Sequence, residues 1–346
     1  AAVAREHEAC RTRAALFDQT SFAKFRVTGP GAEAALSWIC ANDVAKAPGA
    51  LTYTQMLNEA GGIECDLTVA RLGADEFYIV TGTGFATHDF DWIARNLPAG
   101  VQLEDVTGDY ATLALMGPNA RAVLAAAAGG HDVRDAAFPF LRSKRIRIAG
   151  VPVLALRVTY VGELGWELHI PIAGAGDVYD ALKTAGRAHG LVDAGYRAIE
   201  TLRLEKGYRA WGGEIGPDHT PYMAGLGAFV KLKRGGEFLG REALVGQRQR
   251  PLPRLLAGFM VDDPEVVLLG RETIYRDGRR CGWLASGGYG HTIGKAIGYG
   301  YVRSEDGVDA AYVAAGSYEL EVARERVAAQ PFLKPPYDPE NARVRA

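Results

Sequence analysis

The sequence predicts an α+β protein built from two related α+β lobes and a smaller C-terminal domain of short strands. The two lobes are predicted by an internal repeat, because a strand followed by Gly29-Pro30 and a helix recurs 88 positions later around Gly117-Pro118. A β-meander lies between the two copies. Beyond about residue 247, short apolar runs alternate with glycine and aspartate turns, which is typical of a small barrel or sandwich.

The first copy of the repeat is expected to contain two helices and one strand. Helix-forming residues run over 6–16, and the alternation over 23–27 predicts a strand. Pro30 lies near the first turn of a second helix, which is expected over 33–40.

The meander comprises three strands and a closing helix, expected over 51–57, 63–70, 76–81 and 87–96. In the second of these strands apolar and polar residues alternate, so Asp66 lies on the polar face. From the residues alone, this is most often a half-buried strand whose polar face meets water.

A hairpin in the second copy is the feature around which the chain is organised. An apolar strand over 153–159 leads into a glycine-bracketed turn, and the returning strand covers 166–171. Period-2 geometry turns Glu167 and His169 to the face opposite Trp166. A carboxylate therefore stands just past a turn, either as an ordinary solvated residue or as a ligand contact.

A basic strand and two helices flank this hairpin. The basic strand, 142–148, is expected to be a protected sheet edge in preference to a surface for a polyglutamate tail. The helices are expected over 177–188 and 196–206, the second capped by Asp193 and closed by Gly207.

The domain boundary is expected in a polar, proline-bearing stretch that begins at residue 247, which divides the chain into domains 1–246 and 247–346. The second domain is expected to hold five strands, at 255–261, 272–275, 279–286, 295–302 and 317–323.

Composition and charge are those of an ordinary soluble globular protein. The 346 residues are 48% hydrophobic, and 39 Lys and Arg nearly balance 41 Asp and Glu, so neither nucleic acid nor a membrane is predicted as a partner. No apolar run reaches the roughly 18 residues of a transmembrane helix, and the start lacks a signal-peptide core. We expect a cytoplasmic protein, or one of the mitochondrial matrix if the source is eukaryotic.

Cysteine and histidine spacing predicts free thiols and no metal site. The four cysteines lack CxxC spacing, and the seven histidines lack HxxxH and HExxH spacing. The chain does not begin with methionine, which suggests that it is processed or is a piece of something longer. It also carries no dinucleotide-binding fingerprint and no flavin-attachment pattern.

The hairpin Val161-Gly162-Glu163-Leu164-Gly165-Trp166-Glu167-Leu168 resembles the Thr/Val-Gly-Glu-x-Gly-Trp/Tyr-Glu-Leu signature of the folate-dependent aminomethyltransferase family, which includes the glycine cleavage T-protein. Further matches are Leu202-Arg203-Leu204-Glu205 and Ser286-Gly287-Gly288-Tyr289, and the resemblance runs from about Ala9 to Tyr337. It implies a three-lobed fold, with two related α+β lobes, a small C-terminal β-barrel and folate in a central channel.

The resemblance assigns roles to six residues. It implies that Glu167 grips the pterin ring of tetrahydrofolate, which suits a carboxylate because the pterin edge offers two parallel donors. It implies that Asp66 is the catalytic acid beside folate N5 and N10. It assigns cofactor-binding positions at Tyr160, Arg197, Trp211 and Tyr337. Arg197 is the nearest candidate for a folate-contacting arginine that glycine cleavage members carry where this chain has Ile199.

Within the family, the run Thr220-Pro221-Tyr222-Met223-Ala224-Gly225-Leu226-Gly227 resembles the C-terminal halves of dimethylglycine and sarcosine dehydrogenases or oxidases. That branch implies tetrahydrofolate-dependent one-carbon transfer, forming 5,10-methylenetetrahydrofolate from an iminium derived from an N-methyl amine. FAD is expected only on a missing upstream half or on a partner subunit.

Two alternatives stay open. One is a tetrahydrofolate-dependent O- or S-demethylase. The other is a non-catalytic folate-binding protein of the iron–sulfur assembly type, although Tyr208 stands where those proteins carry a cysteine.

Overall fold

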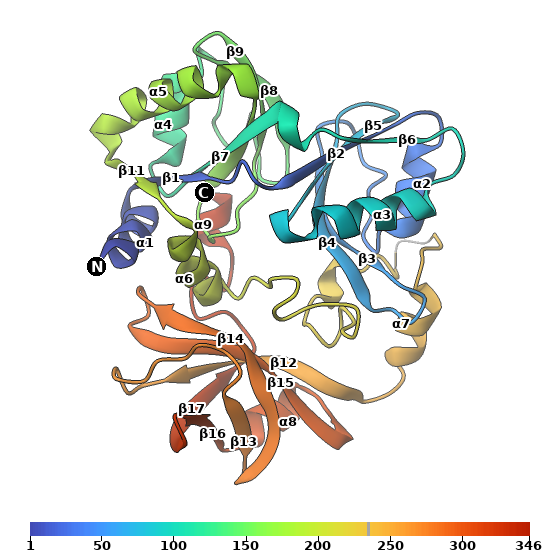
Figure 1. The fold of residues 1–346 in the computed structure, drawn as a ribbon, viewed down its shortest axis with the longest axis vertical. Coiled ribbons are helices and arrows are strands. Elements are labelled where there is room, and N and C mark those ends of the chain that lie inside the picture. Colours follow the sequence, from blue (N-terminus) through green and yellow to red (C-terminus); the bar gives the residue numbers. More distant parts are fainter. Residues whose placement is uncertain (234–235) are drawn as a thin grey trace.

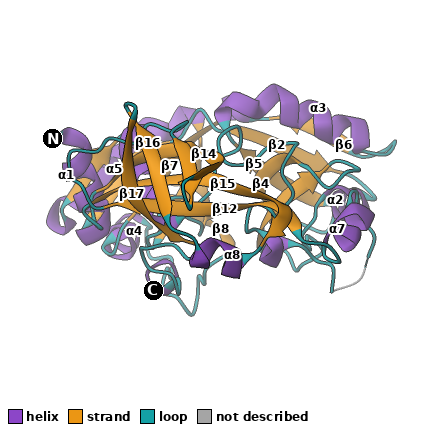
Figure 2. Ribbon diagram, turned by 90° about the horizontal axis from the view of Figure 1, so that it is seen from below, coloured by secondary structure: helices purple, strands orange, loops and turns teal. Residues whose placement is uncertain are grey.

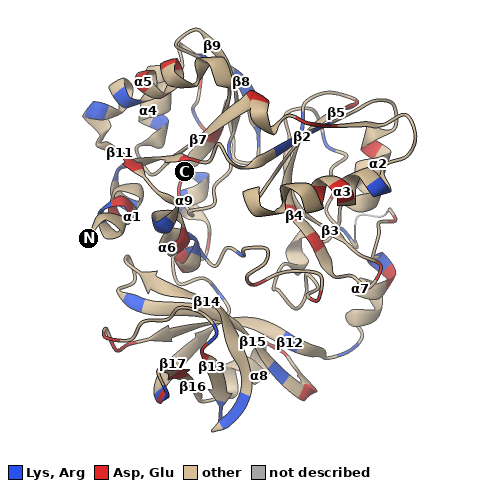
Figure 3. Cartoon of the chain, viewed as in Figure 1, with Lys and Arg blue, Asp and Glu red and all other residues tan. Residues whose placement is uncertain are grey.

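The computed structural model describes residues 1–233 and 236–346 as three lobes around the helix α6 (Tyr196–Lys206), as Figure 1 shows. Seen from below, the barrel strands lie in the middle and the helices of the other two lobes lie on either side (Figure 2). Acidic and basic residues are scattered over all three lobes, as the near-zero net charge implies (Figure 3). None of the described helices is long and apolar enough to cross a membrane.

The first lobe is a five-stranded antiparallel sheet in the order β3-β4-β5-β2-β6. Apolar residues of its strands pack against the inner faces of α2 (Ala32–Ile39) and α3 (Ala86–Asn96), which together form one core. The strands are β2 (Ala23–Thr28), β3 (Leu51–Leu57), β4 (Ile63–Arg71), β5 (Glu76–Thr81) and β6 (Gln102–Asp105).

The second lobe is a six-stranded sheet in the order β11-β1-β7-β10-β9-β8, covered by α4 (Ala120–Ala127) and α5 (Ala175–Gly186). The chain begins in this lobe with α1 (Ala2–Thr12), crosses to the first lobe and returns. The strands are β1 (Ala14–Asp18), β7 (Tyr110–Met116), β8 (Ser143–Ile148), β9 (Val151–Leu156), β10 (Gly165–Pro171) and β11 (Leu191–Ala194).

The third lobe is a closed barrel in the order β12-β15-β14-β13-β16-β17, which decides between the barrel and the sandwich. Its strands are β12 (Leu252–Val261), β13 (Thr273–Arg276), β14 (Arg279–Gly290), β15 (Lys295–Val308), β16 (Tyr318–Val322) and β17 (Glu325–Phe332). The remaining helices are α7 (Arg241–Gln247), α8 (Ala310–Ala315) and α9 (Ala342–Arg345). Single 3₁₀ turns cover Thr83–Phe85, Thr107–Asp109, Ile172–Gly174, Arg187–His189 and Gly227–Phe229.

The internal repeat is confirmed in the backbone. Gly29 and Gly117 both follow a strand and both have positive φ, at 115° and 121°. At both positions a Cβ would meet a backbone carbonyl oxygen, that of Gly100 at 2.7 Å and that of Arg13 at 2.6 Å. The two Gly-Pro turns therefore need glycine for the same two reasons, conformation and close approach.

Four expectations about elements are corrected. The helix expected over 6–16 ends at Thr12, because Ala14–Asp18 is the strand β1, buried between β7 and β11. The hairpin turn is an eight-residue connection from 157 to 164, longer than the tight turn expected.

Asp193 does not cap α6, because it lies in β11 and accepts hydrogen bonds from Tyr179 and Lys183. The barrel also gains a sixth strand, β17. Its sequence, Glu325–Phe332, mixes charged and small residues, and pairing with β12 and β16 makes it a strand.

Candidate active site

Glu167 lies in the middle of the second sheet, on β10 between β7 and β9. Trp166 and its neighbours on one face of β10 fill the lobe core, and Glu167 faces the other way. Only 7% of Glu167 is exposed. Among the described residues, Glu167 has an ion-pair contact with His169, whose Nε2 lies 3.8 Å from the carboxylate. A buried carboxylate with so distant a partner keeps its capacity to accept hydrogen bonds from a ligand.

His169 fixes the orientation of this face. Its Nδ1 lies 3.1 Å from the hydroxyl of Tyr78 on β5 and 3.2 Å from that of Thr112 on β7. Burial lowers the pKa of His169, although Glu167 opposes the shift, so the imidazole is neutral. If Nδ1 accepts hydrogen bonds from the two hydroxyls, the ring proton is on Nε2. Nε2 has no hydrogen-bond partner among the described residues, and the Glu167 carboxylate lies 3.8 Å from it. Because His169 contacts Tyr78 of the first lobe, Glu167, on the same face of β10, also faces that lobe.

Asp66 lies on the first lobe, in an environment that raises the pKa of its carboxyl group. Its Oδ1 accepts from Nε2 of Gln55, directly opposite on β3, at 2.8 Å. Burial raises the pKa of Asp66 to about 6, and hydrogen bonds from Gln55 and Tyr53 oppose the shift. A carboxyl with a pKa near neutrality can both donate and accept a proton at physiological pH.

Tyr160 and Arg209 lie close to Asp66 and come from other parts of the chain. The Tyr160 hydroxyl donates to the Arg209 carbonyl at 2.9 Å, and its ring stacks on Tyr208 with centroids 6.0 Å apart. The charge of Arg209 favours the ionised form of Asp66, and the charge of Asp66 raises the pKa of Tyr160 in addition to the larger effect of burial. The Arg209 Nε donates to the Ala224 carbonyl at 3.1 Å, which fixes the guanidinium.

The three other predicted folate contacts, Trp211, Tyr337 and Arg197, lie in three different environments. Trp211 donates from Nε1 to the Ile63 carbonyl at 3.0 Å, at the start of the strand that carries Asp66. The Tyr337 hydroxyl donates a hydrogen bond to Glu163, and the Arg11 guanidinium lies 3.8 Å above the Tyr337 ring. Tyr337 therefore belongs to a network that fastens the C-terminal tail to the hairpin connection.

Arg197 is exposed at the first turn of α6, and its role as a folate contact stays a prediction. Ile199, which replaces the arginine of the glycine cleavage members, is buried in an apolar cluster with Phe17 and Met116.

Three residues that lie near Asp66 were not predicted from the sequence as part of the site. They are Tyr53, Gln55 and Arg209. The antiparallel register of β3 and β4 places Gln55 opposite Asp66, so strand pairing is a signal for Gln55. Arg209 lies in an irregular segment after α6, where local sequence contains no such signal.

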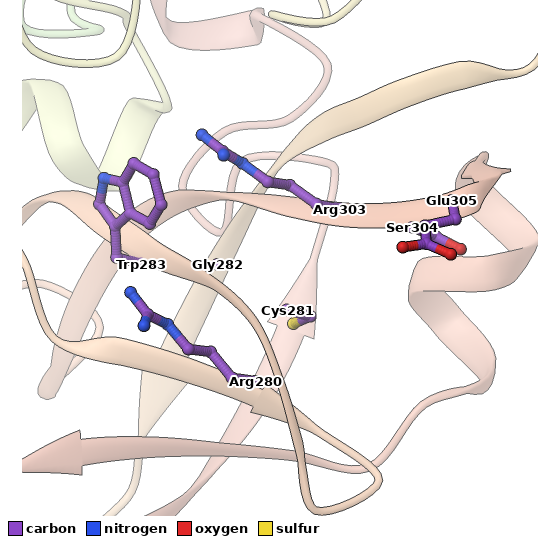
Figure 4. Close-up of a pocket in the computed structure, with 7 residues that line it drawn as sticks. All are labelled: Arg280, Cys281, Gly282, Trp283, Arg303, Ser304 and Glu305. Atoms are coloured by element: carbon purple, nitrogen blue, oxygen red, sulfur yellow. The ribbon is translucent and has the colours of Figure 1, made fainter.

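A shallow cavity of about 390 Å³ lies elsewhere, on the outer wall of the barrel (Figure 4). It is lined by Arg280, Trp283 and Arg303 among others, and the Arg303 guanidinium lies 4.1 Å above the Trp283 ring. Burial lowers the pKa of Arg303, and the charges of Arg254 and Arg280 lower it further. The hollow contains none of the predicted site residues.

Comparison with known proteins agrees with this arrangement. Two family models match: the GCVT N-terminal domain over residues 1–234 and the glycine cleavage T-protein C-terminal barrel domain over residues 254–338. Human mitochondrial sarcosine dehydrogenase is 41% identical over 99% of this chain and 39% of its own length. The chain therefore spans about two fifths of that relative.

An aminomethyltransferase of Halothermothrix orenii is 35% identical over 87% of this chain and 83% of its own length. The crystal structure of the glycine cleavage system aminomethyltransferase T from Bartonella henselae superposes with a TM-score of 0.85 at 28% identity, covering 96% of this chain and 89% of that one. These matches cover the chain nearly end to end and include all three lobes. The chain belongs to the glycine cleavage T-protein family of aminomethyltransferases.

Proposed function

We propose that this chain transfers a one-carbon unit to tetrahydrofolate, forming 5,10-methylenetetrahydrofolate from an iminium derived from an N-methyl amine. In this proposal it is the transferase part of a dimethylglycine or sarcosine dehydrogenase-like enzyme. The observation that carries the proposal is a pair of carboxylates on facing lobes: Glu167, which is buried and has free acceptor capacity, and Asp66, which is half-buried and has a pKa raised to about 6.

The residues present fit tetrahydrofolate. Glu167 is fixed on a central strand. Its contact with His169 is 3.8 Å long, which is too long for a normal hydrogen bond. The nearby ammonium group of Lys24 is taken by the carbonyls of Thr20 and Tyr110, at 2.7 and 2.9 Å. The carboxylate is therefore available to two parallel donors on a pterin edge, with charge assistance. Aromatic rings at Tyr160 and Trp211 offer further ligand contacts.

When bound, tetrahydrofolate supplies the nitrogen nucleophiles that accept the one-carbon unit. The chain's own contribution is to orient it and to move protons. Glu167 holds one end, and Asp66 delivers or removes a proton at the reacting end. Gln55 and Tyr53 fix the Asp66 side chain through hydrogen bonds, so the carboxyl group is already positioned.

The amine and the flavin belong to the larger enzyme that we propose. The relatives that support this are a sarcosine dehydrogenase and a dimethylglycine dehydrogenase, of which the chain spans 39% and 35% of the length. Oxidation of an N-methyl amine requires a hydride acceptor, which FAD provides in flavoprotein dehydrogenases. We place that cofactor on a part outside residues 1–346 and place the folate step within them.

A binding experiment tests the anchor. Glu167→Gln should weaken tetrahydrofolate binding about 10- to 100-fold, because a hydrogen bond to a charged group is worth about 1.5–3 kcal/mol. Isothermal titration calorimetry measures this. Glu59→Gln, an exposed carboxylate on the turn after β3, is the matched control and should bind as the parent does. Equal affinity of the parent and Glu167→Gln would contradict the assignment.

A further inference from the structure

We propose that Cys65, His88 and Asp89 form a binding site for one Zn²⁺-like transition-metal cation in the first lobe. One ligand atom from each residue lies within 4.8 Å of the other two. Cys65 comes from β4 and the other two come from the first turn of α3, so the site joins a strand to a helix (Figure 1). The sequence spacing predicted no metal site, because the ligands are brought together only by the packing of α3 beside β4.

The donor set suits a borderline-soft divalent cation. Thiolate, imidazole and carboxylate are all Zn²⁺ ligands, with bonds of about 2.0–2.3 Å. The His88 Nδ1 is already 3.0 Å from Asp89 Oδ1, a normal spacing for two ligands of one metal. The three ligand atoms lie within 4.8 Å of one another, so a bound ion would draw the Cys65 thiol closer to the other two.

Each ligand except the thiol has an outer partner of the type that orients metal ligands. With Nδ1 facing the metal, the His88 Nε2 is free to donate to Glu64 Oε2, 3.4 Å away. Glu64 is itself fixed by Asn58 Nδ2 at 2.8 Å. The Asp89 Oδ2 accepts from Thr81 Oγ1 at 2.5 Å. A carboxylate behind a ligating histidine is the usual second shell of a zinc site.

Charge and access fit the same conclusion. Cys65 is fully buried and Asp89 is 2% exposed, and among the described residues the only cation partner of Asp89 is His88. A thiolate and a carboxylate together neutralise a divalent ion, so binding replaces protons with metal and leaves no net buried charge. The His88 side chain is 40% exposed, which gives the ion a route in and leaves the fourth position to water.

The site lies next to the candidate active site and is distinct from it. Asp66 follows Cys65 on β4, on the opposite face of the strand. The Trp211 ring lies 5.3 Å from that of His88 and 4.5 Å from that of Phe85. A bound ion would therefore fix the start of β4, the start of α3 and the Trp211 segment against each other.

The test is metal titration of the full chain after dialysis against a chelator. With Co²⁺ we expect one equivalent to bind and a thiolate-to-cobalt charge-transfer absorption to appear, and Zn²⁺ should displace it. Cys65→Ser should abolish the absorption. His88→Ala should lower Zn²⁺ affinity at least 100-fold, and Glu64→Gln about 10- to 100-fold. Cys281→Ser, a half-buried thiol of the barrel, is the matched control and should bind as the parent does.

Two results would overturn the proposal. One is absence of stoichiometric uptake by the parent, as an ordinary hydrogen-bonded cluster at the start of α3 predicts. The other is parental affinity in His88→Ala. Because the His88 side chain is largely at the surface, that variant keeps the test valid even if Cys65→Ser fails to fold.

Discussion

At the scale of single residues, we propose that Asp66 and Glu167 have two different tasks, because their environments differ. Glu167 has acceptor capacity and a fixed strand position, which suits an anchor. Asp66 has a pKa raised to about 6 by burial, which suits proton transfer. The structure thus gives a physical reason for roles that the family resemblance only suggested, and it adds His169, Gln55 and Tyr53 as the groups that orient them.

Asp66→Asn should lose most one-carbon transfer while retaining folate binding. A positioned acid or base contributes roughly 10²–10⁴-fold to a rate, and an amide keeps the size of the carboxyl without its proton chemistry. Binding is expected to stay within several-fold of the parent. Single-turnover transfer at a series of pH values is the measurement, and in the parent the rate should change through about pH 6, following the pKa of Asp66. Transfer by Asp66→Asn at the parental rate would return Asp66 to an ordinary strand residue.

The same substitution should stabilise the fold at neutral pH. The pKa of Asp66 is raised above its unfolded value, so the folded chain binds the proton more tightly, and this contribution to stability is complete below about pH 4. It is lost as the pH rises through about 6. Asp66→Asn, which does not titrate, should therefore gain about 1–3 kcal/mol over the parent by pH 8. Denaturant unfolding at pH 4 and pH 8 measures it. A gap that is equal at both pH values would show that Asp66 is not buried as described.

At the scale of elements, the two Gly-Pro turns set the start of α2 and α4 in the two lobes. Gly117→Ala should destabilise the chain by about 1–3 kcal/mol, because its φ is 121° and the new Cβ would lie 2.6 Å from the Arg13 carbonyl oxygen. Gly108→Ala, where a Cβ meets nothing within 4 Å, is the control. Thermal melting of both variants should show a lower midpoint for Gly117→Ala alone; equal midpoints would mean that the turn relaxes freely.

Elements with strong local signals could be predicted from the sequence, and those made by long-range pairing could not. The meander β3, β4 and β5 and the helix α6 lie within one residue of their expected bounds, because alternation and the Gly207 stop are local. The strand β1 was assigned to a helix because Ala14, Ala15 and Leu16 suit either state, and its pairing with β11 lies more than 170 residues away.

The candidate site follows the same division. Period-2 alternation predicted the strand faces on which Asp66 and Glu167 lie, and the family resemblance supplied their roles. It could not predict that the second face of β10 is covered by Tyr78 of the other lobe, nor that a cysteine of β4 meets a histidine and an aspartate of α3. Packing between elements decides both. Arg197 was proposed from its sequence proximity to Ile199, and a folate contact there stays a prediction.

At the scale of the whole molecule, the three lobes span only about two fifths of the human sarcosine dehydrogenase that the chain matches. We place the boundary between the first two lobes and the barrel at residues 246 and 247, at the C-terminal end of α7 and a few residues before β12 begins. The two family models match on either side of it. The oxidation step is then assigned to another part of a larger enzyme, and the transfer step to these lobes.

This division predicts that the chain alone shows no amine dehydrogenase activity. Dimethylglycine and sarcosine should not reduce an artificial electron acceptor in its presence, because no hydride acceptor is available. The chain should nevertheless accelerate formation of 5,10-methylenetetrahydrofolate from tetrahydrofolate when formaldehyde and an amine supply the iminium. The excess over the uncatalysed reaction should disappear in Asp66→Asn, which serves as the control. Oxidation of either amine by the isolated chain would refute the division, and demethylation of an O-methyl or S-methyl compound with folate alone would replace the amine by another donor.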